Sequence, residues 1–484
     1  MTLATFPGRI LFLGCGSVAQ CTLPLVLREL DVAPANVTVL DMVDNRDRIA
    51  DELAKGVQYE IGQITPENLD AELGRRLGPG DICVDLAWNI DCNVILQWCR
   101  DHGVRYLNTS VEVWDPYEDA ATTHPLDRTL YVRHMRLRRM VASWPDNKGP
   151  SAVVEHGANP GLVSHFTKQA LAELGAAALR DGLLADRVAR IEGALGDCRW
   201  NDLAHALDVK VIHISERDTQ IAARPKEVDE FVNTWSVDGF YEEGIAPAEM
   251  GWGTHERRLP PNAYQHAGEG PGNQICLGQM AHKTWVRSRV PSGDIVGMVI
   301  RHGEAFTICD HLTVWDGLRP AYRPTVHYAY CPSDSGIASF LELEMRRYEL
   351  QPRKRILNDE IVSGCDELGV LLMGHPYKSW WTGSQMTIDE ARALVPHQSA
   401  TTLQVAASVL AAMVWMIERP GEGVCVPDDL PHERVLEVAY PYLGTCFTGP
   451  IDWDPLSSRA DYFDRWSGRY WDEDDPWQYT NFAL

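Results

Sequence analysis

The sequence predicts an α/β protein in which an N-terminal parallel sheet is followed by an α+β domain with a mainly antiparallel sheet. Three observations carry this prediction. An apolar run at 10–13 ends in a glycine-rich turn before a helix. Strands and helices then alternate over the first 150 residues, as in a parallel sheet with crossover helices. From about 165 to 400 separate strands replace this alternation, so we expect domains at 1–155, 156–398 and 399–484.

The first strand runs into a Gly-x-Gly-x-x-Ala turn, and a helix is predicted over 22–30. Gly14 permits the tight turn, Gly16 lets the backbone approach a pyrophosphate, and Ala19 keeps helix and strand close. The helix N-terminus supplies unpaired N–H groups and a partial positive charge for the phosphates. The motif therefore predicts a Rossmann-type domain with a bound dinucleotide, and a glycine turn without a ligand is the alternative.

The next predicted strand, 37–40, ends in Asp41. A carboxylate at this place accepts hydrogen bonds from the adenosine ribose of a dinucleotide. It would repel a 2′-phosphate, so the sequence favours NAD over NADP as the cofactor.

Polar side chains follow further predicted strands at 81–87 and 104–108, namely Asp91 and Glu112. Ligands of open parallel sheets bind outside the carboxyl ends of the strands, so both residues are placed to face cofactor or substrate. A helix cap or a turn is the alternative for each. After a last strand at 152–154, Asn159 either caps the next helix or reaches a ligand.

The second domain is predicted to contain a hairpin that turns at His302 and Gly303. Its predicted strands are 209–216, 295–301, 305–314 and 326–331. The helix at 400–418 is expected to return to the Rossmann sheet. The tail from 449 to 484 contains Trp453, Trp466, Trp471 and Trp477, an aromatic density that favours docking onto the body or a second subunit over disorder.

The net charge of −24 disfavours nucleic acid and anionic membranes as partners and attracts cations, including organic polycations, although solubility alone is an alternative. Twelve cysteines without a Cys-x-x-Cys pair, and the lack of a signal peptide, predict a reduced cytoplasmic protein. The longest apolar stretch, 403–417, is too short to span a bilayer and suits a buried helix. The histidines show no metal-ligand spacing, so we predict no metal site.

Residues 231–256 interleave aromatic rings and carboxylates in a glycine-rich segment. An ammonium group is held by an aromatic face and by carboxylates, so this segment suits a polyamine ligand. The alternative is that Trp235 and Trp252 belong to the core and the acids to a solvated loop.

At these residues the sequence resembles the bacterial homospermidine synthases, a family of the saccharopine dehydrogenase-like group. The resemblance spans residues 10 to about 445. It is carried by Gly14-x-Gly16-Ser17-Val18, Val111-Glu112-x-Trp114, Asn159-Pro160-Gly161-Leu162-Val163-Ser164, Ser215-Glu216-Arg217-Asp218-Thr219-Gln220, Asn233-Thr234-Trp235-Ser236-Val237, Glu249-Met250-Gly251-Trp252-Gly253-Thr254-His255 and Ala400-Thr401-Thr402-Leu403-Gln404-Val405.

The resemblance implies a homodimeric transferase that uses NAD as a recycled prosthetic group. One putrescine is oxidised to an imine, a second adds to it, ammonia leaves, and the new imine is reduced to homospermidine. Trp235 would stabilise the cationic species by cation–π contact, and Asn159 would contact the nicotinamide end of the cofactor. Further site residues implied by the family pattern are Glu243, Glu216, His302, Glu304, Glu112 and Asp91. Asp366, in a turn predicted after Gly364, is a minor candidate for substrate contact.

Two other functions stay open. An NAD(P)-dependent dehydrogenase of saccharopine or carboxynorspermidine type would need Arg or Lys donors for substrate carboxylates, and 231–256 contains no basic residue except His255. A non-enzymatic nucleotide-binding scaffold would be expected to lose the acids around Trp235, which are present.

Overall fold

A parallel sheet organises the N-terminal part of the computed structural model, which describes every residue except 1, 121, 458, 460–462, 464–465 and 467–470. Within the described residues this sheet has seven strands in the order β24-β8-β7-β6-β2-β4-β5, and all of its pairings are parallel. The strands are β2 (Ile10–Leu13), β4 (Val37–Asp41), β5 (Gln58–Ile61), β6 (Ile82–Asp85), β7 (Arg105–Asn108), β8 (Gly149–Val153) and β24 (Glu422–Cys425).

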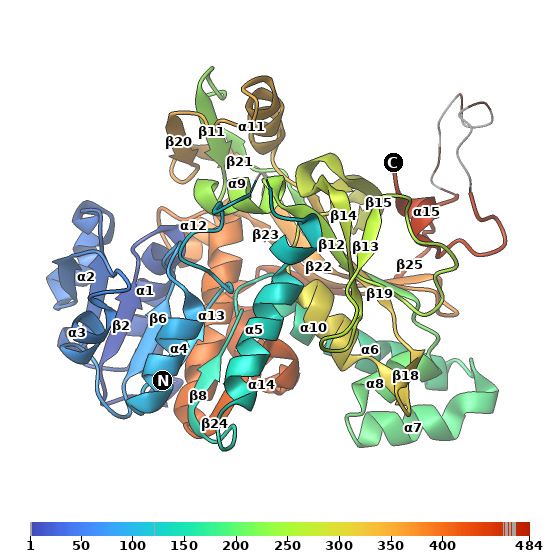
Figure 1. The fold of residues 1–484 in the computed structure, drawn as a ribbon, viewed down its shortest axis with the longest axis horizontal. Coiled ribbons are helices and arrows are strands. Elements are labelled where there is room, and N and C mark those ends of the chain that lie inside the picture. The colour runs from blue at the N-terminus through green and yellow to red at the C-terminus, as the bar shows by residue number, and fades with distance from the viewer. Residues whose placement is uncertain (1, 121, 458, 460–462, 464–465, 467–470) are drawn as a thin grey trace.

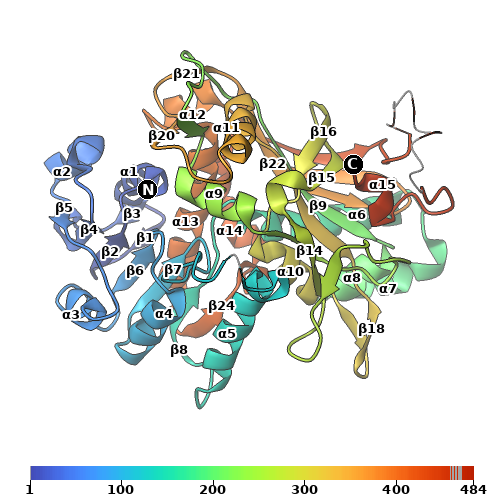
Figure 2. The ribbon, with the colours of Figure 1, turned by 45° about the horizontal axis from the view of Figure 1, so that its top comes forward.

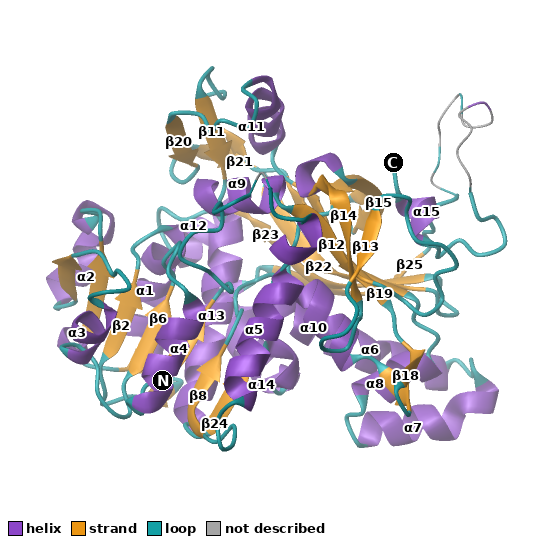
Figure 3. Cartoon of the chain, in the orientation of Figure 1, coloured by secondary structure: helices purple, strands orange, loops and turns teal. Residues whose placement is uncertain are grey.

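Helices flank this sheet, as Figure 3 shows. They are α1 (Ser17–Glu29), α2 (Ala50–Lys55), α3 (Leu69–Gly74), α4 (Cys92–Asp101), α5 (Leu130–Ala142), α13 (Ala400–Glu418) and α14 (His432–Ala439). Helix α1 begins directly at the glycine turn, five residues before the predicted start, and continues through Pro24. This early start brings the first N–H groups of the helix to the carboxyl edge of the sheet.

The second sheet is mixed and mainly antiparallel, and it confirms the predicted fold class. Its main path runs β13-β14-β12-β19-β9-β22-β23-β25 with β15 and β16 attached. Among the described strands of this sheet, only β9 and β19 pair in parallel. The strands are β9 (Val211–Asp218), β12 (Pro247–Gly251), β13 (Ala263–Gln265), β14 (Gln274–Met280), β15 (Trp285–Val290), β16 (Gly293–Met298), β19 (Thr325–Cys331), β22 (Cys365–Met373), β23 (Ser379–Thr387) and β25 (Thr445–Ile451).

The predicted hairpin around His302 is wrong. Strand β16 forms its hairpin with β15, and His302 precedes a buried helix, α10 (Gly303–His311). A short apolar run such as 305–309 has no clear period, so sequence alone does not separate a buried helix from a strand. The turn predicted near Asp366 ends at Gly364, which has φ +107°, and Asp366 lies inside strand β22.

A small lobe stands above the junction of the two sheets in Figure 1. It contains the parallel pair β11 (Glu230–Asn233) and β20 (Arg353–Ile356), the pair β10 (Ile221–Ala222) and β21 (Ile361–Ser363), α9 (Val237–Ile245) and α11 (Asp334–Met345). The other described elements are β1 (Ala4–Thr5), β3 (Leu30–Asp31), β17 (Val314–Asp316), β18 (Arg319–Tyr322), α6 (Leu162–Arg180), α7 (Val188–Gly196), α8 (Trp200–Ala206), α12 (Ile388–Leu394), α15 (Tyr479–Phe482) and the 3-10 turns Pro34–Asn36, Arg46–Ile49, Pro125–Arg128, Ala185–Arg187, Ala281–Lys283, Pro427–Asp429 and Tyr440–Tyr442.

Helix α13 connects the two sheets. It packs against α1, β7 and β8 on one side and against β22 and β23 on the other. Helix α13 is long enough to cross a membrane, and its most apolar stretch of 18 residues has a mean hydropathy of 1.7. However, 89% of that stretch is buried inside the protein, as in a core helix. The described part of the tail also docks, since Trp453 and Trp477 are buried, whereas Trp466 is 68% exposed.

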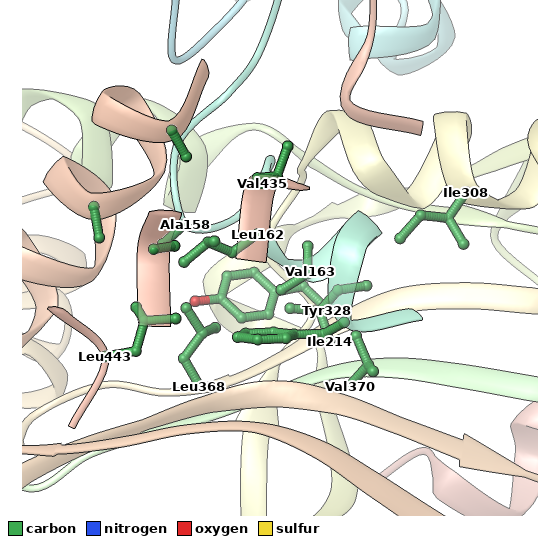
Figure 4. Close-up of a cluster of buried hydrophobic side chains, with 14 of the residues drawn as sticks. Ala158, Leu162, Val163, Ile214, Ile308, Tyr328, Leu368, Val370, Val435 and Leu443 are labelled. Carbon is green, nitrogen blue, oxygen red and sulfur yellow. The ribbon is translucent and has the colours of Figure 1, made fainter. Parts of the chain in front are cut away.

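One hydrophobic core continues from the first sheet into the second. Figure 4 shows Leu162 and Val163 of α6 close to Tyr328 of β19, with Ile214 and Leu368 of the second sheet beside them. These apolar side chains pack the helix that follows β8 against the second sheet. The two sheets are therefore held together by a common core.

Candidate active site

A cleft of about 470 Å³ opens at the glycine turn, between α1 and the small lobe. Gly14 has φ +86°, and a Cβ on Gly16 would meet no atom within 4 Å, so the turn leaves room for a ligand against its backbone. Ser17 begins α1 and Val18 follows it, and no side chain caps this helix N-terminus. Free N–H groups beside an open glycine backbone fit the pyrophosphate of a dinucleotide.

Asp41 fastens the glycine turn to the neighbouring strand. Its Oδ2 accepts a hydrogen bond from the Cys15 N–H at 2.5 Å, and its Oδ1 accepts one from the Val43 N–H at 2.8 Å. The carboxylate is partly exposed at the carboxyl edge of the sheet. It therefore shapes the turn.

Asn159 lies in the loop after β8 of the first sheet and forms a hydrogen bond with Glu216 on β9 of the second. Its loop is tight, because the Gly157 N–H donates to the Pro160 carbonyl at 2.7 Å and a Cβ on Gly161 would come within 1.9 Å of the Gly157 oxygen. This turn directs the Asn159 amide to Glu216, whose Oε2 accepts a hydrogen bond from Nδ2 at 3.1 Å.

Three buried carboxyl groups meet on the second sheet beside this contact. Glu216 and Asp218 are two residues apart on β9 and therefore share a face, and Asp366 of β22 stands opposite Asp218 in the strand register. All three are at most 3% exposed. Tyr328 donates to Glu216, Thr234 donates to Asp218 at 2.5 Å, and one oxygen of Asp366 has no partner.

Burial, reinforced by the charge of Asp218, raises the pKa of Glu216 to about 8. Burial and the neighbouring Glu216 and Asp218 raise the pKa of Asp366 well above its ordinary value. At neutral pH much of this cluster is therefore uncharged when no cation is present. An incoming ammonium group would favour the ionised carboxylates, so the cluster can exchange protons as it binds a cation.

His302 lies between two further carboxylates. Its Nε2 is 3.2 Å from Glu243 Oε2, and its Nδ1 is 3.2 Å from Glu304 Oε1. Burial alone would lower the pKa of His302, but the two carboxylates outweigh it and raise the pKa well above its ordinary value. The imidazole ring is 4.5 Å from the ring of Tyr328, so this triad continues into the Glu216 cluster.

Trp235 provides the aromatic side of the site from the loop between β11 and α9. Its Nε1 donates to the Tyr330 hydroxyl at 3.3 Å, and Tyr330 stacks on Tyr328 at 5.2 Å. The indole is half-buried and packs on Phe240 at 5.6 Å. Aromatic faces and carboxylates thus line one place, as a dication requires.

Glu112 lies in a cluster of charged side chains with Glu242, Arg133 and Arg301, whereas Asp91 lies outside this cluster. Glu112 accepts a hydrogen bond from Ser110 at 2.6 Å, its other oxygen has no partner, and burial and the nearby Glu242 raise its pKa to about 7. Glu242 precedes Glu243 on α9. The structure shows Asp91 as the cap of α4, where it accepts from the Asn93 N–H at 3.0 Å and lies 3.3 Å from the Arg136 guanidinium.

Sequence reasoning missed several side chains that complete the site, namely Asp218, Tyr328, Tyr330, Glu242, Arg133 and Arg301. Asp218 lies two residues beyond the end of the predicted strand 209–216, and a strand predicted to extend to 218 would have placed it on the same face as Glu216. The two tyrosines share this spacing, but their closeness to Glu216 depends on the pairing of β19 with β9, which is not local. Both arginines bind Glu242, and Arg133 Nη2 is 2.8 Å from Glu242 Oε1. Because these residues are far apart in the sequence, no local pattern predicts the contacts.

A Rossmann-type sheet with an open glycine turn, together with a cluster of buried acids on the second sheet, is typical of dehydrogenase-type proteins. Residues 10–153 match the saccharopine dehydrogenase NADP binding domain, and residues 157–445 match the saccharopine dehydrogenase C-terminal domain. The chain is also similar to two curated homospermidine synthases. It is 41% identical to that of Blastochloris viridis, covering 99% of this chain and 97% of the relative, and 39% identical to that of Mesorhizobium japonicum, covering 99% and 96%.

Among solved structures, the homospermidine synthase of Legionella pneumophila in complex with NAD superposes with a TM-score of 0.87 at 35% identity, covering 99% of this chain and 98% of that one. The chain therefore belongs to the homospermidine synthase family.

Proposed function

We propose that this protein is a homospermidine synthase that joins two putrescine molecules with release of ammonia and uses NAD as its recycled cofactor. The observation that carries the proposal is the buried carboxyl cluster of Glu216, Asp218 and Asp366, which is linked to the Trp235 loop through Thr234 and Tyr330. Relatives that match the full length of the chain carry the same name, and one of them binds NAD.

The proposed role of the glycine turn is to hold NAD, which when bound accepts a hydride from the amine and returns it to the second imine. Gly14, Gly16, Ser17 and Val18 would contact the pyrophosphate, and Asp41 would bind the adenosine ribose. Asn159 would orient the nicotinamide end, since its loop leads from the cofactor edge to the substrate acids.

In the proposed reaction the amine must lose a proton before it gives up hydride, while the other ammonium group stays anchored. Glu216 would take that proton, and Glu243 with His302 and Glu304 would hold and relay protons at the reacting nitrogen. Trp235 would stabilise the iminium and ammonium species through its ring. Fixed carboxylates favour the positive charge that develops at the reacting carbon.

A dehydrogenase acting on carboxylated amino acids is less consistent with the site. Two arginines close to Glu112, Arg133 and Arg301, both bind Glu242. Their guanidinium groups are thereby used inside the protein, so they do not form a receptor for a substrate carboxylate.

A homodimer and a cytoplasmic location are part of the proposal. All twelve cysteines of the sequence are among the described residues and none forms a disulfide, as expected for a reducing compartment. Light scattering on the purified protein would test the dimer.

The decisive experiment supplies putrescine and catalytic NAD+ without an external reductant. We expect homospermidine and ammonia by mass spectrometry without net accumulation of NADH at 340 nm. NADH that rises in proportion to product would make the protein a dehydrogenase. No turnover with any diamine would refute the proposal.

A further inference from the structure

The cofactor cleft has a second wall, which does not belong to the nucleotide-binding sheet. One wall consists of Cys15, Gly16 and Ser17 at the start of α1. The facing wall comes from the small lobe, where Asp238 of α9 and Lys354 of β20 line the same cleft. In Figure 2 the small lobe with β20 and α9 lies across from α1, although these elements are more than 200 residues away in the sequence.

The two cationic side chains of this second wall, Arg355 and Lys354, differ in burial and in their ion-pair partners. Arg355 pairs with Glu230 at 3.0 Å and with Glu360 at 3.3 Å, and its side chain is only 10% exposed. Lys354 pairs with Asp238, and the two side chains are 44% and 29% exposed at the cleft. An ion pair this open to water contributes little by itself, so Lys354 can exchange its partner at low cost.

We propose, building on NAD as the cofactor in the proposed function, that Lys354 is a cofactor-binding residue whose ammonium group leaves Asp238 and contacts the pyrophosphate held at Gly16 and Ser17. The helix N-terminus supplies directed N–H donors on one side of the phosphates. The lysine supplies a mobile point charge on the other side. In the absence of the cofactor, Lys354 forms an ion pair with Asp238 instead of with the pyrophosphate.

This contact explains how NAD is retained as a prosthetic group. A cofactor that is oxidised and reduced within one turnover must stay bound between the two hydride transfers. A clamp from the small lobe closes the open side of the cleft. Helix α9 carries Asp238 in its first turn and Glu243, the partner of His302, in a later one, so the same helix links the clamp to the acids of the active site.

Titration of NAD+ into the cofactor-free protein by calorimetry, with no amine present, tests this contact. We expect Lys354→Gln to weaken binding about tenfold, as the loss of one charge-assisted phosphate contact does. Lys354→Arg should keep most of the affinity. Asp238→Asn should bind NAD+ severalfold more tightly, because a competing anion leaves the cleft.

Arg353→Gln is the matched control. Arg353 is the preceding residue of β20, is 52% exposed, pairs with Glu227 at 2.7 Å and is not among the residues that line the cleft. It should bind NAD+ as the wild type does, and unchanged melting curves would show that each variant is folded.

Equal affinity of Lys354→Gln and the wild type, an equal loss in Arg353→Gln, or weaker binding by Asp238→Asn would each overturn the proposal while leaving the proposed function intact. A wild-type protein that does not bind NAD+ at all would instead refute the proposed function.

Discussion

Putrescine binding is expected to release a proton from Glu216. With a pKa of about 8, this carboxyl is about 90% protonated at pH 7. A positive charge within a few ångströms lowers the pKa of an acid by about 1–3 units, so a bound ammonium group would bring it to about 6. The protonated fraction then falls to about 0.1, and about 0.8 proton is released per site.

The sign of this effect sets its pH dependence. Below the raised pKa the free carboxyl is neutral and must lose its proton to pair with the dication. At pH 9 it is already about 90% ionised, so the release through Glu216 should nearly vanish. Since Asp218 and Asp366 titrate together with Glu216, the measured number belongs to the cluster, and the contribution of Glu216 is the difference between variants.

Calorimetry in phosphate and in Tris buffer measures this release, because the two buffers differ in ionisation enthalpy. The protein is loaded with NADH, so that putrescine binds without being oxidised. Glu216→Gln should release about 0.8 proton fewer than the wild type at pH 7. Glu367→Gln is the control, since Glu367 lies next to Asp366 on β22 and bonds to Ser292 and Gln385 on the other face. Equal release by the wild type and Glu216→Gln would refute the reasoning.

Three other substitutions test the site and its frame. Trp235→Ala should fold and keep NAD but lose about 30-fold or more in kcat, the equivalent of about 2 kcal/mol for a desolvated cation–π contact, whereas Trp235→Phe keeps part of the rate; normal turnover of the Ala variant would contradict the role. Gly303→Ala would place a Cβ 1.8 Å from Glu155 Oε2 and should lower the free energy of unfolding in urea by about 1–3 kcal/mol; an unchanged midpoint would show that the carboxylate is free to move. Glu249→Gln should cost about 1–3 kcal/mol in the same assay, since Glu249 accepts from the Leu130 N–H at 2.7 Å and thereby caps α5 from the other domain; stability equal to the wild type would rule out this cap.

Sequence reasoning succeeded where the chemistry is local. The turn of Gly14 and Gly16 is defined by neighbouring residues, and the structure has a cleft at Gly16 with Asp41 bonded to the Cys15 N–H; that these residues bind the cofactor stays a prediction. The parallel and the mainly antiparallel sheets follow from the change in periodicity along the chain, and both are present.

It failed where packing decides. Helix α10 was predicted as a strand because its apolar residues are buried on nearly every side, which removes the helical period. The closeness of Glu216 to Asp366 depends on the register of β9 against β22, and that of Glu242 to Arg133 on the docking of two domains. Such contacts are fixed only when the whole chain has folded.

The course of the C-terminal segment has a consequence for the synthesis of the protein. Strand β24 completes one edge of the parallel sheet, and β25 completes one edge of the second sheet. On the ribosome, the β8 edge of the first sheet therefore stays unpaired until 422–425 have been made, and the β23 edge of the second until 445–451 have been made. A nascent chain in this state exposes strand edges that invite wrong pairing. Messenger RNA features or chaperones that act late in translation would thus affect the yield of this protein more than those that act on its N-terminal half.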